Sequence, residues 1–241
     1  MDKTHHANSP WETFWKENPV GFNATMVQST LFFAKNLAHE LPIQADDRIL
    51  DIGCGPGYLI DDLKGKCAHI HGTDISEKYI AICSEKYATE PEITLSVSKA
   101  YDYGHYEKII VEQRINRVIM LSVLQYYQNK ADVRRLILSL KETAAKQKFS
   151  CLLADIIPVK HSAIDDILSI IKHAIKKGYT LKFVRFLMYA IFSDYRKMKK
   201  NGLLQLDELF FMDLAKEENL QIEVIKNLTL HTSRYSILIN F

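Results

Sequence analysis

The chain has 241 residues, 47% of them hydrophobic, which allows one large domain with a substantial core. Its formal net charge is +2, so charge over the whole chain gives no case for a nucleic-acid partner. Four scattered cysteines without C-x-x-C spacing argue against a zinc site or a disulfide framework and fit a reducing cytosol. We find no secretory signal and no apolar run long enough to span a membrane, and therefore expect a cytoplasmic protein without a metal site.

The first 44 residues are predicted to form an N-terminal helical arm. Residues 1–24 are polar but carry four aromatic anchors, Trp11, Phe14, Trp15 and Phe22. From Thr25 to Leu41 apolar residues recur at helical spacing, and Pro42 ends the pattern. The arm packs on the rest of the chain or, as the alternative, closes as a lid over a ligand site.

Strands and helices alternate in the main domain, residues 45–241. We expect strands at 48–52, 68–73, 93–97, 115–124 and 151–157, with helices at about 57–64, 76–87 and 132–147. A helix at 207–218 and strands at 220–224 and 235–239 follow. The alternation predicts a doubly wound, mostly parallel sheet, on which ligands bind at the carboxyl ends of the strands. Asp51, Asp74, Ala100, residues 121–127 and Asp155 all fall near such ends.

The first strand runs into a glycine-rich loop, Ile49-Leu50-Asp51-Ile52-Gly53-Cys54-Gly55-Pro56-Gly57-Tyr58. Glycines there let a ligand approach the backbone, because no Cβ stands in the way. Asp74 lies 21 residues after Gly53, where a carboxylate at the end of the second strand would reach ribose hydroxyls. The loop departs from the dinucleotide fingerprint G-x-G-x-x-G, since its third glycine comes one place early, after Pro56.

The segment Asp51-Ile52-Gly53-Cys54-Gly55-Pro56-Gly57 closely resembles motif I of the class I S-adenosylmethionine (SAM)-dependent methyltransferases. Asp74 matches that family's acid after the second strand. The resemblance implies a seven-stranded α/β sheet in which the seventh strand is antiparallel and lies between strands 5 and 6. It also implies SAM as the cofactor and S-adenosylhomocysteine (SAH) as the product.

The resemblance implies a cofactor set of Asp51, Gly53, Cys54, Gly55, Gly57, Asp74, Ile75, Ala100, Tyr101 and Leu121. The glycine loop would face the amino-acid half of SAM, and Asp51 would orient the loop or meet the ammonium group. Asp74 would bridge the ribose hydroxyls, with Ile75 against adenine. After the third strand many family members carry an acid before alanine. Here Lys99 stands before Ala100, so the acid is missing unless Asp102 supplies it.

Candidates for the chemistry of the acceptor lie at the ends of the fourth and fifth strands. A base is needed only if the acceptor must lose a proton. We expect Asp155, His161 and Tyr126 to be the catalytic candidates, with His105, Tyr101 and His231 as further polar candidates. The Asn/Asp-Pro-Pro-aromatic motif of the DNA and protein amide methyltransferases is absent after the fourth strand.

Residues 159–205 are predicted to be a helical insertion that caps the acceptor site. Within it, residues 172–200 hold nine Lys or Arg against one acid, around the apolar run 183–192. Helices packed on the core with solvated lysines are one interpretation. A cap over an apolar acceptor that touches anionic membrane is the sharper alternative.

We therefore expect transfer of a methyl group from SAM to a small-molecule or lipid-like acceptor. A non-catalytic SAM-binding protein of the same fold is the main alternative. A nicotinamide-dependent oxidoreductase is disfavoured by the shifted third glycine, and nucleic-acid methylation is suggested only by the basic insertion.

Overall fold

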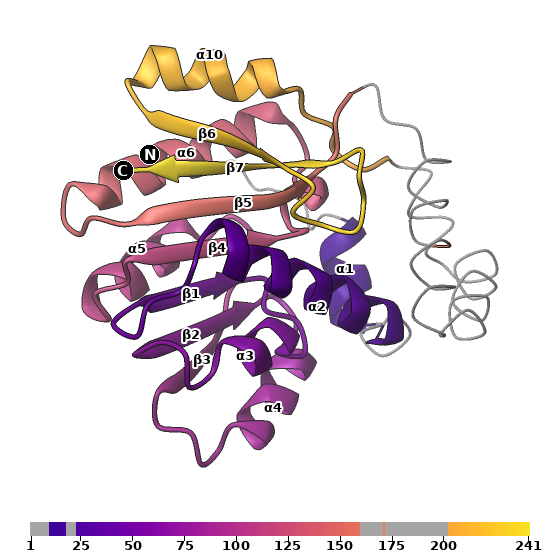
Figure 1. Ribbon diagram of the computed structural model, residues 1–241, viewed down its shortest axis with the longest axis vertical. Helices are drawn as coiled ribbons and strands as arrows, with labels where there is room; N and C mark the ends of the chain where they lie inside the picture. Colours follow the sequence, from indigo (N-terminus) through magenta and orange to yellow (C-terminus); the bar gives the residue numbers. More distant parts are fainter. Residues whose placement is uncertain (1–9, 18–22, 160–170, 172–201) are drawn as a thin grey trace.

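The computed structural model describes residues 10–17, 23–159, 171 and 202–241 (Figure 1). Its centre is a seven-stranded sheet of order β3-β2-β1-β4-β5-β7-β6. The strands are β1 (Arg48–Ile52), β2 (His69–Asp74), β3 (Ile93–Val97), β4 (Arg117–Leu121), β5 (Ser150–Ile156), β6 (Gln221–Lys226) and β7 (Tyr235–Asn240). The helices are α1 (Pro10–Glu17), α2 (Asn23–Glu40), α3 (Tyr58–Leu63), α4 (Glu77–Lys86), α5 (Tyr103–Glu112), α6 (Lys130–Ala144) and α10 (Glu208–Glu218).

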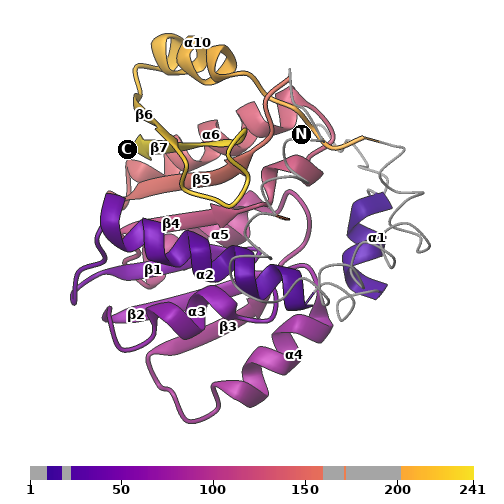
Figure 2. The same cartoon turned by 45° about the vertical axis from the view of Figure 1, so that its right-hand side comes forward.

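Two layers of helices enclose the sheet, as Figures 1 and 2 show. One layer is α2, α3 and α4, and the other is α5, α6 and α10. The central strands alternate between them: in β5, Cys151 and Leu153 join the core under α5, α6 and α10, whereas Leu152 and Ala154 join the core under α2 and α3. Burial on both faces explains why these strands read as nearly continuous apolar runs.

The reversed seventh strand shapes the ligand edge of the sheet. β7 pairs antiparallel with both β5 and β6, and Tyr235 at its start pairs with Ile156 at the end of β5. The loop 227–234 between β6 and β7 therefore lies at the carboxyl edge of the parallel strands. This arrangement confirms the predicted mostly parallel seven-stranded sheet with one antiparallel strand between strands 5 and 6.

The prediction was wrong in two respects around the fourth strand. We expected a strand over 115–124, but β4 ends at Leu121 and a 3₁₀ helix, η2 (Leu124–Tyr126), follows. Ser122 adopts a left-handed conformation (φ 58°), which ends the pleat. We also did not expect the helix α5 from the sequence. Its first turn is capped by the Asp102 side chain, which accepts from the His105 N–H.

The predicted helical insertion at 159–205 falls almost wholly outside the described residues. Among the helices that the structure describes, none is long and apolar enough to cross a lipid bilayer. The α1 helix of the N-terminal arm lies beyond the carboxyl edge of the parallel strands in both views (Figures 1 and 2).

Candidate functional site at the carboxyl edge of the sheet

The loop between β1 and α3 has a backbone that requires its glycines. Gly53, Gly55 and Gly57 all adopt positive φ, at 78°, 53° and 80°. A Cβ on Gly57 would lie 2.5 Å from the Tyr87 hydroxyl oxygen. Both this close approach and the positive φ therefore disfavour any side chain at Gly57. The loop is thus a tight turn at the end of β1 that depends on glycine for its conformation.

Asp74, the last residue of β2, holds this loop in place. Its Oδ2 accepts from the Gly55 N–H at 2.9 Å, and its Oδ1 accepts from the Ser76 N–H at 2.8 Å. Burial raises the pKa of the Asp74 carboxyl, and these N–H donors oppose the rise. Each carboxylate oxygen has a second lone pair, so the group can still accept from a hydroxyl of a ligand.

Asp51 is the least satisfied polar group of the site. Its side chain is 2% exposed, and its Oδ2 has no hydrogen-bond partner among the described residues. Burial, and to a lesser extent the nearby Asp74 charge, raises the pKa of Asp51 to about 7. A buried acceptor without a partner is costly, and a cationic donor would relieve that cost.

The loop is supported from α4 as well. The Tyr87 hydroxyl lies 2.7 Å from the Gly57 carbonyl oxygen and 2.9 Å from Asp61 Oδ1. Cys54 and Cys83 both lie against the Gly55 carbonyl oxygen, with Sγ at 3.7 and 3.4 Å. These contacts fix the backbone of the loop before any ligand binds.

The remaining predicted cofactor residues line the same edge. Ile75, Ala100, Tyr101 and Leu121 follow or end β2, β3 and β4, and all four are half-buried. Tyr101 has positive φ (61°), and its hydroxyl oxygen accepts from the Gln128 N–H at 3.2 Å. These strand ends are where ligands bind in doubly wound sheets.

A second polar cluster forms where β4 and β5 end. Asp155, 4% exposed and with φ 69°, accepts from Ser122 Oγ at 2.6 Å and Thr229 Oγ1 at 3.0 Å. It also pairs with Arg234 Nη1 at 2.7 Å and His231 Nδ1 at 3.2 Å. Burial raises the pKa of the Asp155 carboxyl, but Arg234 and His231 outweigh burial and hold that pKa well below its usual range.

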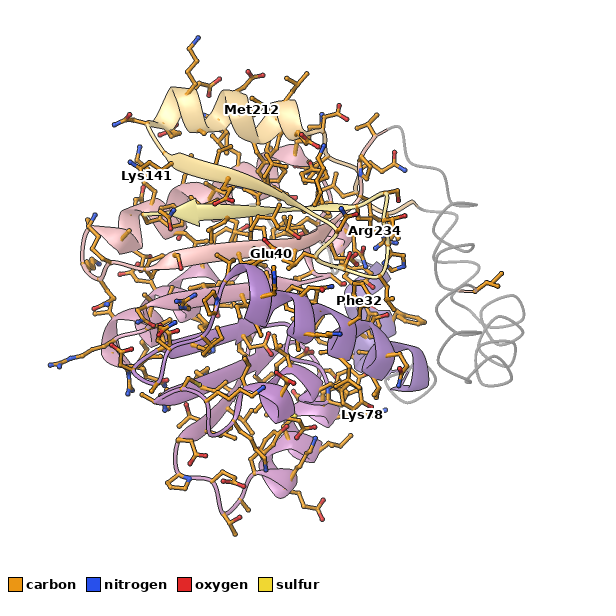
Figure 3. All side chains as sticks on the ribbon, viewed as in Figure 1. Phe32, Glu40, Lys78, Lys141, Met212 and Arg234 are labelled. Carbon is orange, nitrogen blue, oxygen red and sulfur yellow. The ribbon has the colours of Figure 1, made fainter. Side chains whose placement is uncertain are left out.

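The β6–β7 loop supplies three members of this cluster, Thr229, His231 and Arg234. Figure 3 shows Arg234 at the same end of the sheet as α1. Its Nη1 also donates to Gln125 Oε1 at 3.1 Å, which links the loop to η2. The sequence analysis did not single out Arg234 or Thr229, because only the antiparallel run of β7 brings this loop to the end of β5.

The N-terminal arm approaches the site at two points. The Trp15 ring of α1 meets the Tyr126 ring edge to face, with centroids 5.6 Å apart. A Cβ on Gly55 would lie 3.4 Å from Met26 Cε of α2. The predicted catalytic residue His161 lies outside the described residues.

Comparisons with known proteins agree with this geometry. Residues 49–147 match the family model described as a methyltransferase domain. An uncharacterized methyltransferase of Schizosaccharomyces pombe is 28% identical over 74 residues, which cover 31% of this chain and 27% of that protein. The matched stretch thus spans about a quarter of the curated relative.

Solved structures show the same fold at low sequence identity. Magnesium protoporphyrin IX methyltransferase from Synechocystis PCC 6803 with bound SAM has a TM-score of 0.57 at 12% identity, covering 99% of this chain and 98% of that one. Phosphoethanolamine N-methyltransferase 1 of Haemonchus contortus, in complex with phosphoethanolamine and SAH, has a TM-score of 0.60 at 12% identity, covering 95% of this chain and 47% of that one. The sheet order and the glycine loop agree with the match of residues 49–147 to a methyltransferase domain, and the chain has the fold of the class I SAM-dependent methyltransferases.

Proposed function

We propose that the chain transfers a methyl group from SAM to a small-molecule acceptor of apolar or lipid-like character, giving SAH. The observation that carries the proposal is the buried Asp51 oxygen, which has no hydrogen-bond partner in the described part of the chain, beside a glycine loop that Asp74 holds in place. This combination matches a ligand with an ammonium group at one end and vicinal hydroxyls nearby, as in SAM.

Each residue then has a defined task in binding. Asp51 accepts from the ammonium group and becomes fully ionised. Asp74 accepts from the ribose hydroxyls with the lone pairs that its backbone donors leave free. SAM, when bound, supplies a methyl group on a positively charged sulfur, which is already a good leaving group. The protein therefore contributes mainly orientation and exclusion of water.

The acceptor side of the site favours a small molecule. Two structural neighbours have small-molecule substrates in their names, a magnesium porphyrin and phosphoethanolamine. In this chain the aromatic pair Trp15 and Tyr126 lies beside the strand ends. Burial of an apolar acceptor against these rings would contribute favourable binding free energy. Tyr126 is accordingly proposed to contact the acceptor rather than to move a proton.

We further propose that residues 1–44 act as a lid and residues 159–205 as a cap, in a cytoplasmic protein. The Trp15 and Met26 contacts support the first part, and the scattered free cysteines support the location. The basic and apolar sequence of 172–200 supports contact with anionic membrane. Flotation with anionic vesicles tests that contact, and absence of binding at low salt would remove it.

The activity is tested with SAM labelled on its methyl group. The protein is incubated with the organic phase and, separately, with the aqueous phase of a cell extract, and both SAH and the labelled product are measured. We expect label in the organic phase, no transfer by Asp74→Ala, and unchanged transfer by Asp46→Asn, whose carboxylate is exposed in the turn before β1. Absence of SAH formation with every fraction would contradict the proposal.

A further inference from the structure

The cluster around Asp155 contains an imidazole whose surroundings suit proton transfer. His231 Nδ1 lies 3.2 Å from Asp155 Oδ1, and the His231 side chain is 16% exposed. Its Nε2 makes no hydrogen bond that the structure records among the described residues. The imidazole thus has one nitrogen held by a buried carboxylate and the other available at the carboxyl edge of the sheet.

The chemistry of Asp155 decides which nitrogen carries the proton. Because the Asp155 pKa is held well below its usual range, its carboxylate is ionised at neutral pH and can only accept. His231 Nδ1 must therefore be the donor in this contact. In the neutral ring, Nε2 is then left as a bare lone pair, which is the state that a general base needs.

The backbone conformation of two residues supports a functional role for this arrangement. Ser122 directly follows β4, and Asp155 lies in the irregular part of β5 between Leu153 and Ile156. Both adopt positive φ (58° and 69°) although neither is glycine. Such strained residues persist only where surrounding contacts hold them, and they gather at functional sites. Here the two strained residues meet in a hydrogen bond of 2.6 Å, and the carboxylate that they position meets His231.

We propose that His231 is the general base of this methyltransferase and that Asp155 is its positioning residue. The inference rests on the proposed function and narrows it to acceptors that carry a proton on the attacking atom, of which a hydroxyl is the simplest. His231 Nε2 takes the proton as the acceptor oxygen forms its bond to the methyl carbon. The carbon–sulfur bond breaks with its electron pair on sulfur, leaving SAH, a methyl ether and an imidazolium paired with Asp155.

The base must lie close to the reacting methyl group, and this can be measured without knowing the acceptor. SAM carries a positive sulfur, whereas SAH is neutral at the same atom. We would record the His231 ring signals of the full chain by NMR at one neutral pH, with the protein saturated with SAM in one sample and with SAH in the other. The His231→Gln variant assigns the signal, and His39, exposed on α2, is the control ring.

We expect the nitrogen shifts to show His231 protonated at Nδ1 in its neutral form. We also expect the His231 ring signals to differ between the two samples, because only SAM places a positive charge beside the ring. The His39 signals should be the same in both. Identical His231 signals in the two complexes, or a proton on Nε2, would overturn the inference while leaving the proposed function intact. Failure of both ligands to bind in calorimetry would instead remove the proposed function, and this inference with it.

Discussion

Replacing Asp51 by Asn removes a buried charge while keeping the size of the side chain. Asp51 is 2% exposed, and the structure describes no hydrogen-bond partner for its Oδ2. Its pKa in the folded protein is raised to about 7, chiefly by burial. Between pH 4 and pH 7 the folded chain therefore binds a proton at Asp51 that the unfolded chain does not, so stability falls as the pH rises across this window.

The size of the change in stability follows from the shift in the Asp51 pKa. The pKa rises from 3.8 to about 7, about three units, and each unit is worth about 1.4 kcal/mol, so ionised Asp51 lowers stability by about 4 kcal/mol. Asn cannot ionise. We therefore expect Asp51→Asn to match the wild type near pH 4 and to exceed its stability increasingly up to pH 8.

Urea unfolding of ligand-free protein at several pH values measures this difference. Subtracting the wild-type free energy of unfolding from that of the variant cancels the contributions of all other titrating groups. Asp46→Asn, at an exposed carboxylate, is the matched control for loss of a charge. A difference for Asp51→Asn that does not change with pH would refute the assignment of a buried, protonated Asp51.

Two further substitutions probe the loop and the second cluster. Gly57→Ala should cost about 1–3 kcal/mol more than Gly65→Ala, because both positions have positive φ but only at Gly57 would the Cβ strike Tyr87. Equal losses in thermal unfolding would contradict that contact. Arg234→Met should cost about 3–5 kcal/mol by removing the guanidinium that pairs with the buried Asp155 charge at 2.7 Å, and the double variant with Asp155→Asn should recover most of it. Simple additivity in denaturant unfolding would argue against the pair.

Local sequence was sufficient to predict that the proposed cofactor residues lie close together. The acid, the three glycines and Asp74 lie within one strand–helix–strand unit, so their spacing predicts their proximity. The sequence did not reveal that Asp74 binds the Gly55 N–H, because that contact depends on the twist of the loop. The sequence did not assign the adenine contact, because Lys99 replaces the expected acid unless Asp102 supplies it. The structure shows Asp102 capping α5.

The acceptor side could not be predicted in the same way. Asp155 was picked out as a strand-end acid, but its partners come from a loop more than 70 residues later that only the β7 reversal brings near. With Arg234 and His231 beside it, Asp155 has too low a pKa to act as a base itself. Long-range pairing of this kind leaves no periodic signal in the sequence.

The central claim is that the loop at 51–57 and Asp74 bind SAM, and calorimetric titration with SAH tests it most directly. Protein shown to be folded and free of carried-over ligand is titrated with SAH, with NADH as the control. We predict tight SAH binding, no NADH binding, and a loss of at least tenfold in affinity for Asp74→Ala but not for Asp46→Asn. Folded protein that binds no SAH, or an Asp74→Ala variant that binds it as well as the wild type, would contradict the account.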